Sequence, residues 1–191
     1  IFFCIACNTT TELQTNSSII VEKREKYNAS NTRKVDLVHT DLSVMFDWEK
    51  QHVLGEARLI LKPYFHAINS LQIDAKGFDI HNISLIENNK KTDLNFKYDN
   101  KKIDISFPET YTKNEEINLF IKYTAKPNEL ANSTGLPISG DKGLYFINPL
   151  GEEKNKPQQI WTQGETEYNS CWFPTIDSPN ESMTQELAIT V

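Results

Sequence analysis

Apolar and polar residues alternate along most of the chain between residues 35 and 125. The first run alternates Leu42, Val44 and Phe46 with neighbours that are polar except for Met45, and similar runs recur at short intervals. Successive side chains of a strand point to opposite faces, so this period of two predicts half-buried strands. Further strands are expected at residues 53–61, 71–75, 78–85, 94–98, 103–107 and 117–123. No window longer than ten residues has the spacing of a capped helix.

This pattern predicts an all-β domain of about eight strands in twisted antiparallel sheets. Asp99 and Asn100 separate two alternating runs and tolerate the backbone of a tight turn, which indicates a hairpin. Pro63 and Pro108 are expected to end strands because proline cannot donate to a ladder. The residues from 187 onward begin another strand.

The beginning of the chain follows neither period. Residues 1–7 are apolar and read as the end of a secretory signal, and residues 8–34 are polar and read as a disordered tether. We therefore divide the chain into a lead-in at 1–34 and an ordered domain at 35–191. Ala6-Cys7 followed by polar residues resembles a bacterial lipoprotein processing site, which would make Cys7 the acylated first residue of an exported lipoprotein. An ordinary cleaved signal is the alternative.

Composition excludes some classes of function. Among the 191 residues, 38% are hydrophobic and the net charge is −6, so the chain lacks the basic footprint of a nucleic-acid-binding protein. The four histidines have no partner at metal-ligand spacing, and there is no glycine-rich phosphate loop or serine-hydrolase motif. Acidic residues at polar strand positions, such as Asp74, Asp79 and Asp104, are expected on a solvated face.

The segment from residue 159 to residue 179 has neither a period of two nor one of 3.6, although it is rich in aromatic residues and proline. It is expected to be a rigid loop fixed by local contacts. Glu165 and Glu167, close to Gln163, could grip a cation or an amine, or could be ordinary solvated acids.

Other residues of the same segment are expected to be structural. Trp161, Trp172 and Phe173 are interpreted as core or interdomain packing, and Cys171 as a small buried residue. Asp177 is expected to brace its own turn through backbone hydrogen bonds.

The same segment carries a motif of the form T-Q-x-E followed by F-P-x-x-D-x-P. It resembles the amino-terminal domain of the zinc aminopeptidase family that includes aminopeptidase N and leukotriene hydrolase. The resemblance extends over residues 35–191, but its specificity comes from residues 159–181. Ser170 stands where the family often has Arg, Thr175 where it has Cys, and Asn180-Glu181 where a basic residue is commoner, which leaves the preferred peptide open. The matching residues are Thr162, Gln163, Glu165, Phe173, Pro174, Asp177 and Pro179.

The resemblance implies a saddle-like β-sandwich that leans on a separate thermolysin-like catalytic domain. It also implies that Glu165 binds the α-ammonium of a peptide substrate and that Gln163 helps to position the first residue. The zinc ligands, two His and a Glu, would lie downstream, so the parent would be an exported zinc aminopeptidase and this fragment alone would be inactive. Its location would be the periplasm, the outer membrane or the cell surface of a bacterium.

Two other functions remain open at this point. A non-catalytic β-sandwich binding module of the cell surface would use the aromatic residues for ligand contact. A family member could also have kept the fold and lost its catalytic residues. An H-E-x-x-H motif followed by a more distant Glu in the downstream sequence would identify the peptidase.

Overall fold

The computed structural model describes residues 32–88, 90–130 and 142–190. Contacts divide the chain into two units, Ile1–Thr32 and Arg33–Val191, and the elements described below belong to the second. The predicted lead-in and Cys7 lie outside the described residues, so the boundary at residue 34 stays a prediction. Within the described part of the chain, no helical segment combines the length and the apolar character needed to cross a membrane.

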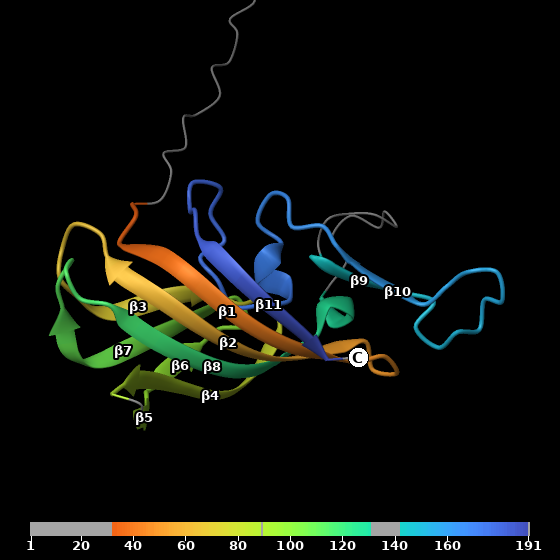
Figure 1. Cartoon of the computed structure of the whole chain (residues 1–191), viewed down its shortest axis with the longest axis horizontal. Coiled ribbons are helices and arrows are strands. Elements are labelled where there is room, and N and C mark those ends of the chain that lie inside the picture. The colour runs from red at the N-terminus through yellow and green to blue at the C-terminus, as the bar shows by residue number, and fades with distance from the viewer. Residues whose placement is uncertain (1–31, 89, 131–141, 191) are drawn as a thin grey trace, which may run out of the picture. The chain divides into compact units, whose positions relative to one another are not determined.

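The largest element is a six-stranded sheet with the order β11-β1-β2-β8-β4-β5 (Figure 1). All neighbouring pairs are antiparallel except β1 and β11, which run parallel, so the expectation of purely antiparallel sheets is wrong at this edge. A parallel pair needs a long connection, and here almost the whole unit lies between the two strands. The strands are β1 Val35–Asp47, β2 His52–Pro63, β4 Phe78–Glu87, β5 Lys90–Asp93, β8 Ile117–Ala125 and β11 Thr184–Thr190.

A three-stranded sheet, β3-β7-β6, and a two-stranded hairpin of β9 and β10 complete the β structure. Figure 1 shows the three-stranded sheet crossing behind the larger one. Its strands are β3 Ile68–Asp74, β6 Phe96–Tyr98 and β7 Lys102–Tyr111, and the hairpin pairs β9 Leu144–Ile147 with β10 Gln159–Thr162. Two short 3₁₀ turns, η1 Pro127–Glu129 and η2 Asn169–Cys171, are the helical elements of the described residues.

One continuous core lies between the two larger sheets. On β8, Ile117, Leu119, Ile121 and Tyr123 are all at most 1% exposed, while the residues between them face outward. The same cluster contains Ile73, Ile103 and Ile105 of the three-stranded sheet. Burial of alternate apolar side chains from both sheets explains why the period of two is so clear, and it confirms the all-β prediction.

Several strands differ from the sequence prediction, and three of them have a clear physical reason. β7 continues through Pro108 to Tyr111, because its ladder with β3 shifts register between Ile68 and Ser70 and no partner pairs with the proline. β5 is exposed at every position, so it has no apolar face that could reveal it. β10 lies within the segment that we expected to be a loop, and its pairing with β9 supplies an order that the sequence does not show.

Candidate functional site

The β9–β10 hairpin leads directly into residues 163–179, which we call the acidic loop. Beyond the last pair of the ladder, the Gln163 backbone N–H donates to the Gly143 carbonyl at 2.9 Å. On the hairpin itself, the rings of Tyr145 and Trp161 stack with their centroids 4.6 Å apart. The beginning of the acidic loop is therefore held by the backbone of the residue just before β9.

Gly143 allows the acidic loop to come this close to the hairpin. Its φ is +66°, and a Cβ atom there would lie 1.9 Å from the Tyr168 carbonyl oxygen. Such a contact is far inside van der Waals distance, so any larger residue would displace one of the two segments. Glycine is required here for both its conformation and its lack of a side chain.

The middle of the acidic loop is a closed turn followed by a buried segment. The Tyr168 N–H donates to the Gly164 carbonyl at 3.0 Å, which closes residues 164–168. Cys171, Trp172 and Phe173 follow and are 0%, 7% and 3% exposed, which confirms the packing predicted for them. Trp161 is different, since it is 39% exposed and packs on Tyr145 instead of in the core.

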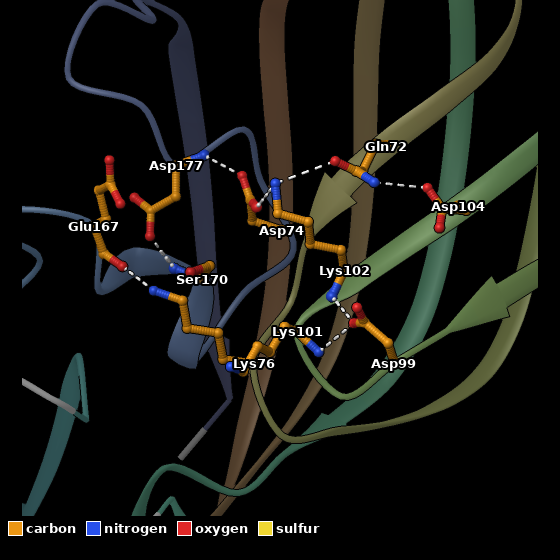
Figure 2. Close-up of polar contacts among 10 residues, drawn as sticks. All are labelled: Gln72, Asp74, Lys76, Asp99, Lys101, Lys102, Asp104, Glu167, Ser170 and Asp177. Atoms are coloured by element: carbon orange, nitrogen blue, oxygen red, sulfur yellow. Dashed lines mark hydrogen bonds and ion pairs between the residues drawn. The ribbon is translucent and has the colours of Figure 1, made fainter. Parts of the chain in front are cut away.

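The end of the acidic loop is tied to the last residue of β3. Asp74 and Thr175 form an isolated antiparallel bridge, with N–H to carbonyl distances of 2.8 and 3.1 Å. The Asp74 carboxylate also accepts a hydrogen bond from the Asp177 N–H at 3.0 Å and faces the Lys102 ammonium at 3.4 Å (Figure 2). The expectation of a solvated Asp74 is therefore wrong: its side chain is 24% exposed and has partners on two segments.

Asp177 stabilises the acidic loop from within. Its carboxylate accepts a hydrogen bond from the Ser170 N–H at 2.8 Å, at the 3₁₀ turn seven residues earlier (Figure 2). This confirms a structural role, although the partner is η2 and not the turn of Asp177 itself. The loop is thus closed on itself by Asp177 and fixed to the sheet by Asp74.

Lys76, which the sequence showed only as a turn residue after β3, contacts the same loop with both backbone and side chain. Its N–H donates to the Ser170 carbonyl at 2.7 Å. Its ammonium donates to the Glu167 carbonyl at 2.5 Å (Figure 2). The same ammonium lies 5.3 Å from the centroid of the Tyr168 ring. No sequence signal could have identified Lys76 or Asp74, because each contact joins residues about a hundred positions apart.

The two predicted binding residues lie close together on this anchored loop. Gln163 is half-buried, whereas Glu165 and Glu167 are exposed. Among the described residues, the Glu165 carboxylate has no hydrogen-bond or ion-pair partner. A carboxylate of this kind is free to accept a cationic ligand, but an ion pair that stays exposed to water contributes only about 0–1 kcal/mol. Strong binding at Glu165 therefore needs a further surface that removes the pair from water.

No metal site accompanies these residues in the described part of the chain. Residues 32–88, 90–130 and 142–190 contain no group of three or more His, Cys, Asp or Glu that could hold an ion. The acidic loop has exposed acids, but it lacks the convergent ligands that a zinc ion requires.

The model of the peptidase M1 N-terminal domain matches residues 12–191. The chain belongs to this family. The match confirms the family resemblance that the motif in residues 162–179 indicated.

Solved structures share the fold of this M1 N-terminal domain. A mutant M1 zinc metallopeptidase from Deinococcus radiodurans, bound to a Tyr-Ser-Ala substrate, has a TM-score of 0.64 at 18% identity, over 82% of this chain and 32% of that one. Native yeast LTA4 hydrolase has a TM-score of 0.63 at 18% identity, over 88% of this chain and 25% of that one. At such identities the likeness shows the fold alone, and the chain spans about a third of the metallopeptidase and a quarter of the hydrolase. A comparison with curated proteins finds no match.

Proposed function

We propose that this M1 N-terminal domain belongs to an exported zinc aminopeptidase and that Glu165 binds the α-ammonium group of the substrate. Gln163, two residues before it, helps to position the first residue of the peptide. The observation that carries this proposal is the exposed Glu165 carboxylate, which lacks a partner among the described residues, while its loop is bonded to Gly143 and to Asp74 of β3 and is closed internally by Asp177.

The chemistry of an exopeptidase explains why such a group is needed. An enzyme that releases amino-terminal residues must hold the chain terminus at a fixed distance from the bond that is cleaved. A carboxylate on a rigid loop selects the free α-ammonium and excludes internal segments, which carry no charge there. The metallopeptidase of similar fold is described with a bound Tyr-Ser-Ala substrate, which supports a peptide ligand for the parent of this chain.

The remaining parts of the reaction belong to a second domain in this proposal. Zinc would polarise the peptide carbonyl and activate water, and the described residues do not provide its ligands. A thermolysin-like catalytic domain of the same protein would hold the metal and would cover the acidic loop. That cover would remove the Glu165–ammonium pair from water, which is the condition for strong binding.

The proposal is tested in the full-length enzyme with L-leucinol, which carries an α-ammonium but no bond to hydrolyse, and with N-acetyl-leucinol. We define the ammonium preference as the inhibition constant of the acetylated compound divided by that of leucinol. Loss of one partner of a desolvated charge pair costs about 2 kcal/mol or more, so Glu165→Gln should lower the ammonium preference at least about 30-fold. Peptide turnover should fall with it.

Glu167→Gln is the matched control, because Glu167 is an exposed acid two residues away in the same loop. It should keep the wild-type ammonium preference. Wild-type inhibition and turnover in Glu165→Gln would overturn the proposed role of Glu165, and equal losses in both variants would show a general effect of loop charge instead.

Export and anchoring form a separate part of the proposal. We infer from the Ala6-Cys7 sequence that Cys7 becomes the acylated first residue, which would attach the protein to a bacterial membrane facing the periplasm or the cell surface. Mass measurement of the mature amino terminus tests this directly. An unmodified terminus at another residue would indicate an ordinary cleaved signal.

A further inference from the structure

The direction of the Glu165 side chain depends on the backbone that carries it. The carboxylate has no partner of its own among the described residues, so side-chain contacts do not hold it in place. Glu165 lies inside the closed turn of residues 164–168. The position of that turn therefore decides where the carboxylate points.

The turn is held at both ends by different parts of the molecule. On one side, the Gln163 N–H donates to the Gly143 carbonyl at 2.9 Å. On the other side, the Lys76 ammonium donates to the Glu167 carbonyl at 2.5 Å, and it lies over the Tyr168 ring at 5.3 Å from the centroid. The ammonium of Lys76 thus contacts Glu167 and Tyr168, the last two residues of the turn.

Lys76 can fix the acidic loop because its own backbone is fixed. The neighbouring Ala75 and Gly77 donate their N–H groups to the carbonyls of Lys101 and Asn100, at 2.8 and 2.9 Å. The Tyr98 hydroxyl donates to the Ala75 carbonyl at 2.9 Å and accepts a hydrogen bond from the Phe78 N–H at 2.7 Å. Burial of this hydroxyl raises the pKa of Tyr98 above its ordinary value. Lys76 therefore projects from the turn between β3 and β4, whose backbone is bonded to residues 100 and 101 between β6 and β7.

We propose that Lys76 is a positioning residue for Glu165, which acts on substrate binding by fixing the turn that carries this carboxylate. The inference rests on the proposed function and deepens it. The hydrogen bond to the Glu167 carbonyl and the cation over the Tyr168 ring together fix the position of the turn relative to Lys76. Without the ammonium, the turn loses its contacts with Lys76 at the Glu167 carbonyl and the Tyr168 ring.

The test uses the full-length enzyme and the ammonium preference defined above. Lys76→Met removes the donor and the charge but keeps the length of the side chain, and it should lower the ammonium preference about 3- to 10-fold. KM for peptides with a free terminus should rise more than kcat falls, because the reacting groups lie elsewhere. Lys76→Arg keeps a cation that can donate a hydrogen bond and lie over a ring, so this variant should keep most of the wild-type ammonium preference.

Lys91 provides a matched control. Its ammonium lies 3.3 Å from the centroid of the Phe120 ring, on the edge strand β5 of the other sheet. Lys91→Met therefore removes a lysine–aromatic contact of the same chemistry from a different place. It should leave the ammonium preference at the wild-type value.

A double-mutant cycle separates positioning from general destabilisation. If Lys76 acts through Glu165, then Lys76→Met should have no further effect on the ammonium preference once Glu165→Gln is present. If Lys76→Met does not fold, Lys76→Gln takes its place, with the same direction and a smaller loss. A wild-type preference in a folded Lys76 variant, or an additive loss in the double variant, would overturn the positioning role. An unchanged preference in Glu165→Gln alone would instead overturn the proposed function.

Discussion

At the scale of single residues, Glu181 shows how a departure from the family pattern has a structural role. Its side chain is 4% exposed, and its carboxylate accepts hydrogen bonds from Arg33 and from the Leu37 N–H, both at 2.8 Å. The hydrogen bond from Arg33 is the main reason why the pKa of this guanidinium lies above its ordinary value. Glu181 thus attaches the loop before β11 to the beginning of β1, although nothing in the sequence paired the two segments.

We expect Glu181→Gln to lower the free energy of unfolding by about 1–3 kcal/mol, because one charged partner of a mostly buried hydrogen-bonded pair is lost. The pKa of Arg33 is higher in the folded protein than in the unfolded chain. Its pair with Glu181 therefore stabilises the fold fully at pH values below the unfolded-state pKa, and this stabilisation is lost only as the pH rises through the folded-state pKa. The loss should therefore be the same throughout the neutral range. Denaturation followed by tryptophan fluorescence measures it, with the exposed Glu186→Gln on β11 as the control. Equal stability of the two variants would contradict the role of Glu181.

At the scale of elements, most of the predicted strands bury one face in the core, although β11, which was also predicted, is exposed at every position. On β1, β2 and β8, alternate residues enter the core, and the sequence therefore displays the period of the strand. β5 and β10 could not be predicted, because neither buries a complete face and only pairing with a neighbour defines them. The contacts of the acidic loop could not be predicted either, because Asp74 and Lys76 bind residues that are distant in the sequence and come close only in the folded sheets.

The approach of the β9–β10 hairpin to the acidic loop can be tested with two glycines. Gly143 and Gly151 both have positive φ, +66° and +70°, but only at Gly143 would a new Cβ meet a backbone atom, at 1.9 Å. At Gly151 the nearest atom would be 3.8 Å away. Alanine at either position costs about 1 kcal/mol of backbone strain, and Gly143→Ala should lose at least about 1–2 kcal/mol more.

The same two alanine variants also test whether the hairpin positions the proposed binding residues. Since Gly143 touches Tyr168 and accepts the Gln163 hydrogen bond, Gly143→Ala should reduce the ammonium preference of the full-length enzyme, whereas Gly151→Ala should not. Unfolding free energies and inhibition constants are measured for both variants. Indistinguishable results would mean that the hairpin and the loop do not depend on one another.

At the scale of the whole molecule, the proposed function would give this domain the charge that binds the substrate, but not the desolvated surroundings that would make the binding strong. The Glu165 carboxylate is exposed in Arg33–Val191, and a pair with an ammonium group in water is worth about 0–1 kcal/mol. The same pair, covered by a second domain, would be worth several times as much. Affinity for a peptide terminus is therefore expected to be a property of the assembled enzyme.

This difference predicts the behaviour of residues 33–191 expressed alone, once circular dichroism shows that they are folded as β structure. Titration with L-leucinol, followed by calorimetry or NMR, should give no saturable binding below about 10 mM, because an exposed ion pair does not offset the entropy lost on association. N-acetyl-leucinol should behave in the same way, and no peptide should be hydrolysed. Full-length enzyme should distinguish the two compounds. Micromolar binding of leucinol by the domain alone would mean that the described residues already form a complete, desolvated site, and that no second domain is needed to create it.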